Sequence, residues 1–306
     1  MIQSHSLEEL HLQNSWLTIG VFDGVHRGHQ QIIREVTAGA HDAHAPAVVL
    51  TFWPHPATVL GNQEVKSLTT LDERAELLAA LGVDVMIAQT FDTSLANTPA
   101  PDFVARLKEH LGLQHLLIGY DFALGKGRQG NAARLTEIGK ELGYELEVIP
   151  ALADESGVVS STEIRKLVAI GNVNDAADLL GHCYGLHGLV VHGDGRGRQL
   201  GFPTANIDYP AEKILPANGV YACRGWVDGK AYSAATNVGV RPQFHDKADK
   251  PLVEAYVLDF DRDIYGQDIR LEFVARLRAE LKFASVDALV EQMKLDVIRT
   301  RDLLSS

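Results

Sequence analysis

Three glycines and two histidines share one short segment near the N-terminus, G-V-F-D-G-V-H-R-G-H at residues 20–29. Glycines let a backbone approach a ligand closely, and the start of a helix presents free N–H groups to a phosphate. Two histidines three residues apart there could stabilise the charge of a reacting phosphoryl group. The segment therefore predicts a site for the phosphates of ATP. The expected phosphate-binding residues are Gly20, Phe22 and Gly28, with His26 and His29 as catalytic groups.

The same residues allow other interpretations. A glycine-rich turn is often only a turn, and two histidines are half of a zinc site, although no further ligand has a suitable spacing. A Walker A loop is excluded, because no Gly-Lys-Ser or Gly-Lys-Thr ending follows. The H-x-G-H core resembles instead the adenylyl-transfer superfamily that includes class I aminoacyl-tRNA synthetases.

A second segment, S-S-T-E-I-R at residues 160–165, stands at the start of another predicted helix. Its first and fourth residues fit a capping box, which would explain them without a ligand. Ser161, Thr162 and Arg165 would also project at this helix N-terminus, where they are suited to hold the β- and γ-phosphates of ATP. Arg165 would supply a fixed, forked cation.

Two further loops carry polar side chains after predicted strands. His55 lies between two prolines, which stiffen the loop and remove backbone donors. Asp121 and Phe122 precede a basic, glycine-rich G-K-G-R run at residues 125–128. Each segment by itself is equally well explained as a rigid or solvated loop.

The second half has its own glycine-rich loop, at residues 193–201, followed by P-T-A-N. Gly193, Gly197 and Arg198 are suited to cradle phosphates, although the glycines could merely form hairpin turns. Thr204 and Asn206 offer neutral oxygens two residues apart, which suits a Mg²⁺ ion that keeps several waters.

Glu254 is a lone carboxylate in an otherwise apolar predicted strand. Such a residue lies either on an exposed sheet edge or in a functional site. Near ATP and Mg²⁺ it is suited to accept a proton from a substrate hydroxyl. The segments N-V-G-V-R-P-Q-F at 237–244 and D-I-Y-G at 263–266 accompany it.

The elements that must position these residues alternate between strand and helix in the first half, which predicts a parallel α/β sheet with helices on both faces. Ligands of such sheets bind at strand-to-helix turns, where the glycine–histidine segment lies. Strands are expected at Trp16–Phe22, Ala47–Phe52, Val83–Ala88, His115–Gly119 and Tyr144–Ile149, and helices at His29–Ala40, Leu71–Leu81, Asp102–Leu111 and Ala132–Leu142.

After about Gly181 the period of the hydrophobic pattern changes to two residues, which predicts an antiparallel β-barrel. A C-terminal helix that begins at Ser285 is expected to follow it. The Asp228-Gly229 pair predicts a tight hairpin, and D-R-D-I-Y-G-Q predicts that the last two strands pair. Strands are expected at Gly188–His192, Val220–Val227, Lys230–Thr236, Leu252–Asp259 and Ile269–Ala275. The change divides the chain into predicted domains 1–182 and 183–306.

The formal net charge of −12 is unevenly divided, with 12 Lys and Arg against 23 Asp and Glu up to Cys183, and 16 against 17 after it. An acidic first half argues against a nucleic-acid partner. No apolar run approaches the ~20 residues of a membrane helix, and no signal-peptide pattern is present. With two cysteines outside any CxxC motif, this predicts a cytoplasmic protein with reduced thiols and no membrane partner.

The four segments of the first half, in this order, resemble the FMN adenylyltransferase module of bacterial bifunctional riboflavin kinase/FAD synthetases. The G-F-P-T-A-N run at 201–206 resembles the riboflavin kinase module of the same family. The resemblance implies a Rossmann-like nucleotidyltransferase domain followed by a kinase barrel, with riboflavin, FMN and ATP as substrates and Mg²⁺ as cofactor. The sequence departs from residues frequent in that family at Leu124, at His182-Cys183 and at Gln243.

The resemblance also implies roles for the candidate residues. His26 and His29 would contact the ATP phosphates in FAD formation, and Glu254 would be the base acting on the terminal ribityl hydroxyl in FMN formation. Thr204 and Asn206 would bind Mg²⁺ and ATP. The remaining expected residues are Ser161, Thr162 and Arg165 on the far side of the ATP phosphates and His55, Asp121 and Phe122 at the flavin.

Two alternatives stay open. One is an adenylyltransferase for another acceptor, although a tRNA synthetase would carry a lysine-rich K-M-S-K-S-type loop that this chain lacks. The other is a flavin- or nucleotide-binding sensor with one or both sites inactive. The presence of His26, His29, Arg165 and Glu254 argues against the sensor, and turnover distinguishes the two.

Overall fold

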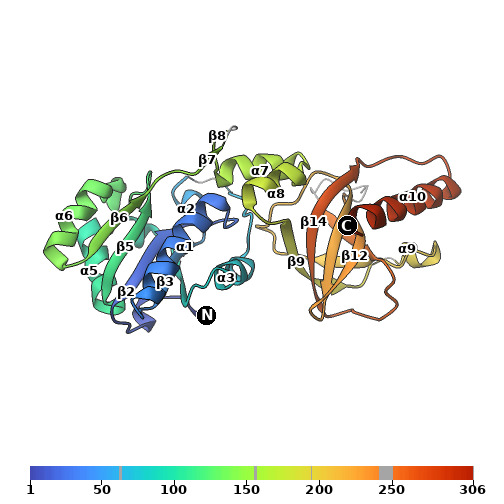
Figure 1. The fold of residues 1–306 in the computed structure, drawn as a ribbon. Coiled ribbons are helices and arrows are strands. Elements are labelled where there is room, and N and C mark those ends of the chain that lie inside the picture. Colours follow the sequence, from blue (N-terminus) through green and yellow to red (C-terminus); the bar gives the residue numbers. More distant parts are fainter. Residues whose placement is uncertain (62–63, 155–156, 194, 241–250, 306) are drawn as a thin grey trace. The chain divides into compact units, whose positions relative to one another are not determined.

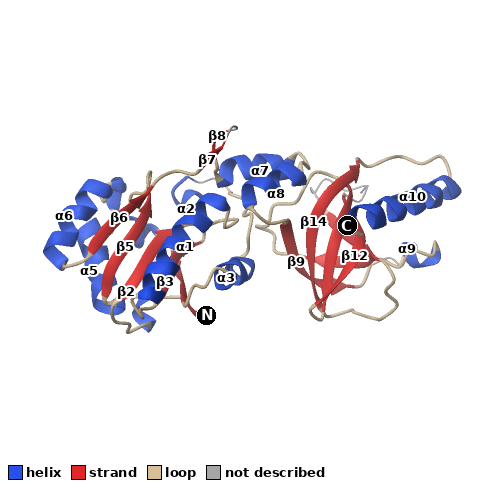
Figure 2. Cartoon of the chain, viewed as in Figure 1, coloured by secondary structure: helices blue, strands red, loops and turns tan. Residues whose placement is uncertain are grey.

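The computed structural model describes residues 1–61, 64–154, 157–193, 195–240 and 251–305. Contacts divide the chain into two compact units, Met1–Ser161 and Thr162–Ser306, and each is described by itself. Figures 1 and 2 show their helices and strands. The R-P-Q-F part of the predicted 237–244 segment and Asp194 of the glycine-rich loop lie outside the described residues.

The first unit is built on a six-stranded parallel sheet in the order β1-β4-β3-β2-β5-β6, which confirms the predicted α/β class. Its strands are β1 (Ile2–Ser4), β2 (Ser15–Gly20), β3 (Ala47–Trp53), β4 (Val85–Thr90), β5 (Leu113–Gly119) and β6 (Glu145–Ile149). The edge strand β1 is absent from the sequence prediction, because it is too short to show a periodic pattern.

Helices cover both faces of this sheet (Figure 1). Successive residues of β3 point to opposite faces, so Val48 and Leu50 pack with α5 and α6 while Val49 packs with α1 and α3. The helices of the unit are α1 (Arg27–Asp42), α2 (Pro56–Gly61), α3 (Leu71–Ala80), α4 (Thr93–Ala96), α5 (Ala100–Leu111) and α6 (Ala132–Leu142). Two 3₁₀ turns, η1 (Leu7–Glu9) and η2 (Lys126–Arg128), and a small ribbon, β7 (Ala153–Asp154) and β8 (Gly157–Val158), complete it.

The chain order reverses at β2. It runs from β2 to β3 and β4 on one side, then returns to β5 and β6 on the other side of β2. A reversal of this kind opens a crevice at the carboxyl ends of the two central strands. The carboxyl end of β2 is Gly20, the first residue of the glycine–histidine segment.

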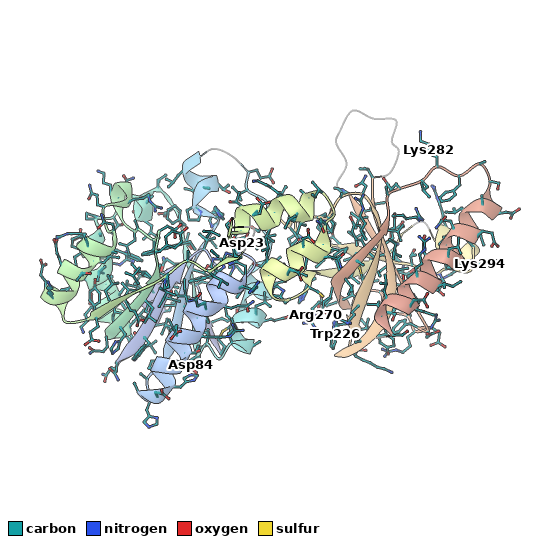
Figure 3. The ribbon with its side chains drawn as sticks, turned by 45° about the horizontal axis from the view of Figure 1, so that its top comes forward. Asp23, Asp84, Trp226, Arg270, Lys282 and Lys294 are labelled. Carbon is teal, nitrogen blue, oxygen red and sulfur yellow. The ribbon has the colours of Figure 1, made fainter. Side chains whose placement is uncertain are left out.

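The second unit contains a closed antiparallel barrel in the order β10-β13-β12-β11-β14-β9, which confirms the predicted barrel. Along β14, Leu271 and Phe273 are buried, while Arg270 alternates with them on the outside and stacks 4.6 Å from the ring of Trp226 (Figure 3). The strands are β9 (Tyr184–Val191), β10 (Ala205–Asp208), β11 (Gly219–Val227), β12 (Lys230–Gly239), β13 (Leu252–Val257) and β14 (Asp268–Arg278).

The two predicted strand pairings of this unit have different outcomes. The Asp228-Gly229 hairpin is confirmed, since Val227 pairs with Lys230 and the two turn residues have φ of 49° and 74°. The pairing of residues 252–259 with 269–275 is wrong. In the closed barrel β13 pairs with β10 and β12, and β14 with β9 and β11, so neither strand has a free edge for the other.

In the described part of this unit, the barrel is accompanied by α7 (Ser161–Ala169), α8 (Val173–Leu180), α9 (Arg196–Gln199) and α10 (Val286–Leu304). Asn174 of α8 donates to the Val274 carbonyl of β14 at 3.1 Å, and Arg276 of β14 donates to the Ile170 carbonyl at 3.2 Å. The hairpin of α7 and α8 therefore packs on the barrel, although the predicted domain division at 182/183 follows it. Ser285 caps α10 as predicted, accepting from the Ala288 N–H at 3.2 Å.

Across the described ranges, no helix combines the length and the apolar composition needed to cross a bilayer.

Candidate active sites

The glycine–histidine segment turns from β2 into α1 and brings its two histidines together. Their rings stack with centroids 3.6 Å apart. His26 is the N-cap of α1, and its Nδ1 accepts the backbone N–H of His29 at 3.4 Å. Because Nδ1 accepts, a neutral His26 carries its proton on Nε2, which is then the nitrogen able to donate to a ligand.

Close packing explains the glycines of this turn. A Cβ on Gly20 would lie 3.0 Å from the ring of Phe22, and one on Gly28 would lie 3.3 Å from the ring of His26. Phe22 is only 2% exposed and its ring meets His29 edge-on at 5.1 Å. Phe22 therefore supports the histidines, and only its backbone remains for the predicted phosphate contact.

Asp23 holds the turn in place, a role that the sequence reasoning missed. Its carboxylate accepts the backbone N–H groups of Leu68 and Thr69 at 2.9 Å each. The Thr69 hydroxyl in turn accepts the N–H of Gly24 at 3.0 Å. The sequence signal is an acidic residue in a predicted phosphate-binding turn, where a negative charge would repel the phosphates unless it is buried and paired.

The partner of Asp23 is Arg74, whose guanidinium lies 3.7 Å from the carboxylate. Arg74 also donates to the Thr51 hydroxyl at 2.8 Å, and Thr51 donates to the Val21 carbonyl at 2.8 Å. Helix α3 and the end of β3 are thereby connected to the turn through charged and polar groups that water does not reach.

The other predicted residues of this unit lie at the same edge of the sheet. His55 follows β3, where its Nδ1 accepts the N–H of Ala57 at 3.1 Å. Asp121 and Phe122 follow β5, and Phe122 is half-buried against the core. Because β3 and β5 flank β2, their carboxyl ends adjoin the glycine–histidine turn.

Ser161 is attached to the same turn, since its hydroxyl donates to the Asp23 carbonyl at 2.9 Å. Thr162 and Arg165 follow it in α7, which belongs to the second unit. Their part in phosphate binding, like the flavin contacts of His55 and Asp121, stays a prediction.

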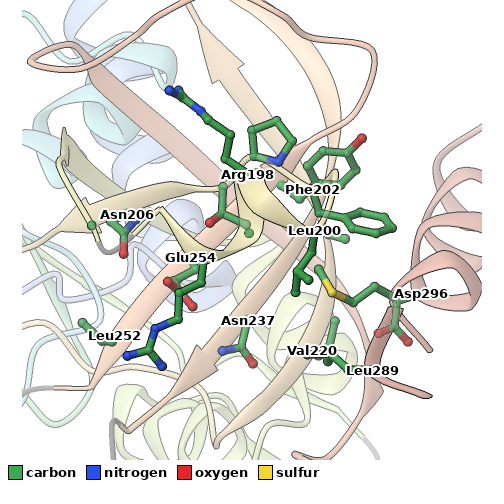
Figure 4. A pocket seen from close by; sticks show the side chains of 18 of the residues that line it. Arg198, Leu200, Phe202, Asn206, Val220, Asn237, Leu252, Glu254, Leu289 and Asp296 are labelled. Atoms are coloured by element: carbon green, nitrogen blue, oxygen red, sulfur yellow. The ribbon is translucent and has the colours of Figure 1, made fainter. Parts of the chain in front are cut away.

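In the second unit, three polar side chains form a row across neighbouring strands. Glu254 of β13 stands opposite Asn206 of β10 on one side and opposite Asn237 of β12 on the other. Figure 4 shows the three beside one cavity. The barrel is closed, so the alternative that Glu254 lies on an exposed sheet edge is excluded. The sequence marks Asn237 only as part of a segment that accompanies Glu254.

The Asn206 side chain has a polar atom whose hydrogen bonding is incomplete. Asn206 is 9% exposed, and its Oδ1 is buried without a hydrogen-bond partner among the residues that the structure describes. Such an atom in a native site calls for an explanation such as a bound ion. A side chain on Gly193 would collide with the Asn206 amide, and a Cβ on Gly197 would lie 3.2 Å from the Thr204 hydroxyl.

These oxygens fit Mg²⁺, which prefers hard oxygen ligands and retains several waters. In the parts of the chain that the structure describes, no three His, Cys, Asp or Glu side chains gather to hold a metal. An ion bound here would therefore depend on Thr204, Asn206 and the phosphates of a nucleotide.

The row lines the first of two cavities in the second unit. The first, of about 480 Å³, lies between the barrel and α10. The second, of about 410 Å³, extends toward residues 260–265. Their shared wall is formed by Arg198, Pro203, Thr204 and Tyr265. Two substrates held on either side of this wall would meet at Thr204.

The first cavity also has residues to which the sequence reasoning gave no functional role. Helix α10 contributes Leu289, Met293 and Val297, which share one face of the helix, together with Asp296. Arg278 at the end of β14 completes that side. Asp296 gives only a weak sequence signal, as an acidic residue that continues the apolar face of the helix.

Comparison with known proteins gives two family models that match consecutive parts of the chain. One, described as FAD synthetase, matches residues 8–163, and one described as riboflavin kinase matches residues 180–304. A bifunctional riboflavin kinase/FMN adenylyltransferase of Listeria monocytogenes is 37% identical over 94% of this chain and 92% of its own. The protein of the same name from Escherichia coli K12 is 34% identical over 97% of this chain and 95% of its own.

Among solved structures, one described as a macrolide-efflux protein from Streptococcus pneumoniae matches with a TM-score of 0.89. It is 31% identical in sequence, and the match covers 98% of both chains. The two proteins therefore share both folds, the parallel α/β sheet and the antiparallel barrel with its C-terminal helix.

Proposed function

The chain belongs to the family of bifunctional riboflavin kinases/FMN adenylyltransferases, and on that basis we propose that it makes FAD in two ATP-dependent steps. The second unit transfers the γ-phosphoryl group of ATP to riboflavin, giving FMN and ADP. The first unit joins FMN to the AMP moiety of a second ATP, giving FAD and pyrophosphate. The observation that carries the proposal is the row of Asn206, Glu254 and Asn237 in a cavity that shares a wall with a second cavity.

In the kinase step, Glu254 accepts the proton of the terminal ribityl hydroxyl as its oxygen attacks the γ-phosphorus. The bond from the γ-phosphorus to the bridging oxygen of ADP breaks at the same time. The support for this role is position: Glu254 is half-buried on the cavity face of β13, next to the unpartnered Asn206 oxygen. General-base catalysis of this kind contributes roughly 10²- to 10⁴-fold to a rate.

Thr204 and Asn206 would hold Mg²⁺, which supplies neutralisation of the phosphate charge. Arg198 and the backbone of the glycine-rich loop bind the phosphates from the other side. Gly193 and Gly197 have no space for a side chain beside Asn206 and Thr204, which keeps that loop close to the phosphates.

We assign riboflavin to the first cavity and ATP to the second. The first is lined on the α10 side by Leu289, Met293 and Val297, which suit the apolar faces of a flavin ring. The second is lined by backbone and side chains of residues 260–265 and by Arg198, which also reaches the shared wall. A phosphate placed at that wall lies within reach of both substrates.

In the adenylyl transfer, an oxygen of the FMN phosphate attacks the α-phosphorus of ATP and pyrophosphate leaves. The N-terminus of α1 binds the phosphates with its first-turn N–H groups and the positive end of its dipole. His26, through Nε2–H, and His29 donate to the oxygens on which charge develops. The stacked geometry supports this pairing, because both rings lie at the helix N-terminus.

The direct test is incubation of the purified full chain with riboflavin, ATP and Mg²⁺, followed by chromatography of the flavins. We expect FMN to appear first and FAD to follow, with formation of ADP and pyrophosphate. Binding of flavin without either product would establish the sensor alternative. FMN formation without FAD would indicate that the first unit transfers the adenylyl group to another acceptor.

A further inference from the structure

One buried ion pair connects helix α10 to the barrel at the first cavity. Arg278 at the end of β14 donates to the Asp296 carboxylate from Nε at 3.0 and 3.1 Å and from a terminal nitrogen at 2.8 Å. Gln292, one turn earlier on α10, donates to the same carboxylate at 3.0 Å. The side chains of Arg278 and Asp296 are 14% and 4% exposed, so the pair is largely shielded from water.

Arg278 also organises the connection between β14 and α10. Its other terminal nitrogen donates to the Ala279 carbonyl at 3.1 Å. Its guanidinium lies 5.8 Å from the centre of the Phe283 ring, and Phe283 lines the cavity. One side chain thus contacts the strand end, the connection and the helix that together form one side of the first cavity.

Helix α10 buries few of its own side chains. Of its residues, only Asp296 and Thr300 are buried. The apolar side chains that face the barrel line the cavity, and Leu295 and Ile298 are exposed. A helix is normally held by burying an apolar face, and the cavity removes much of that contribution here. The ion pair therefore contributes to the position of α10, together with its partly buried apolar side chains and the exposed pair of Arg301 with Asp259.

We infer that Arg278 and Asp296 are a positioning pair that sets the width of the first cavity and thereby the affinity for riboflavin. The inference rests on the proposed function, which assigns riboflavin to that cavity. Neither residue acts on the reacting atoms, which lie near Glu254. A buried ion pair suits this task because it requires one specific geometry, even where its net contribution to stability is small.

The test is Asp296→Asn in the full chain, with steady-state kinetics for both substrates of the kinase step. We expect the KM for riboflavin to rise about tenfold, the size of effect expected from loss of one coupled pair. The KM for ATP should change less than about twofold, since ATP is assigned to the second cavity, which neither Arg278 nor Asp296 lines. Conversion of added FMN to FAD should be unchanged and reports that the first unit is intact.

The chain offers a matched control. Arg301 of α10 makes a second forked pair with Asp259, just after β13, at 2.6 and 2.7 Å. These side chains are 49% and 69% exposed and line neither cavity. Asp259→Asn should leave both KM values within about twofold, because exposed ion pairs contribute little.

Two further variants keep the inference testable if Asp296→Asn does not fold. Arg278→Lys retains the charge but loses the fork, so the KM for riboflavin should rise about threefold. The double variant Arg278→Gln/Asp296→Asn should bind riboflavin no more weakly than the worse single variant, because the two residues act as a unit. An unchanged KM for riboflavin in folded Asp296→Asn or Arg278→Lys, or an equal rise for ATP, would overturn the inference. A native chain that forms no FMN would overturn the proposed function instead.

Discussion

At the scale of single residues, the ion pair of Asp23 and Arg74 gives a sharp prediction. Their side chains are 2% and 1% exposed (Asp23 is labelled in Figure 3). Asp23→Asn removes the negative charge and leaves Arg74 buried beside a neutral amide, which should cost about 3–5 kcal/mol of stability. Urea unfolding followed by circular dichroism measures this loss.

Asp84→Asn is the control for that substitution. Asp84 also accepts a backbone N–H, that of Ala47 at 2.9 Å, but its side chain is 46% exposed. It also lies 3.1 Å from Nε2 of His41, whose side chain is 50% exposed. The loss of the Asp84 charge should cost less than about 1 kcal/mol, as for other exposed pairs. Equal stability of the two variants would contradict the positioning role given to Asp23.

A second residue-scale prediction concerns Cys223, which is fully buried in the barrel. Burial raises the pKa of its thiol from 9.0 to about 12. The folded state therefore favours the neutral thiol. The stability that this preference contributes is present below pH 9 and is lost as the pH rises from 9 toward 12. In a Cys183→Ser variant, Cys223 should not react with a thiol reagent at about pH 8 until denaturant is added. Fast labelling of the native variant would show that the thiol is accessible.

At the scale of elements, Gly171 joins α7 to α8 where that hairpin packs on the barrel. Its φ is +80°, and a Cβ there would lie 2.7 Å from the Tyr221 hydroxyl oxygen and 3.1 Å from Arg276. Gly171→Ala should therefore cost both backbone strain, about 1–2 kcal/mol, and a packing penalty of about 1–3 kcal/mol. Thermal inactivation of the kinase activity measures the sum.

The variant Gly229→Ala separates the backbone strain from the packing penalty. Gly229 has a φ of +74° but open space around its Cβ position, so only the backbone strain applies. The Gly171 variant should lose activity at a clearly lower temperature than the Gly229 variant. Similar loss in both variants would mean that the hairpin of α7 and α8 shifts away from the barrel without an energetic cost.

At the scale of the whole molecule, the two proposed activities should be separable by single substitutions. His29→Ala should lower FAD formation from added FMN about a hundredfold, the effect of losing one well-placed donor to a charged transition state. Glu254→Gln should lower FMN formation by roughly 10²-fold or more through loss of the base. Each variant should retain the other activity at the native level. A loss of both activities in one folded variant would contradict the assignment of one reaction to each unit.

The same two variants should complement each other when mixed. His29→Ala makes FMN from riboflavin, and Glu254→Gln converts that FMN to FAD, because FMN is a diffusible product. Chromatography of the mixture should show FAD from riboflavin, which neither variant forms well by itself. Absence of FAD, with both residual activities intact, would show that FMN passes only within one molecule.

Much of the architecture followed from local patterns. The alternation of strands with helices, the change to period two and the Asp228-Gly229 turn predicted both fold classes, because each pattern extends over a few neighbouring residues. The glycine–histidine segment and the G-F-P-T-A-N run were recognisable for the same reason. The residues of each segment lie close together in the chain, so a short stretch of sequence already contains the predicted chemical groups.

The tertiary structure decided the features that depend on closure of the barrel and on contacts between residues distant in the chain. The wrong pairing of β13 with β14 arose because local turn signals do not encode which strands a closed barrel brings together. Asp23 and Arg74 meet across 51 positions, and Arg278 meets Asp296 only because α10 folds back on the barrel. Asn237 joins Glu254 through a strand register that no short pattern contains. Sequence determined which chemical groups are present and in which elements, whereas burial and register, which arise only when the chain is packed, decided which of them act together.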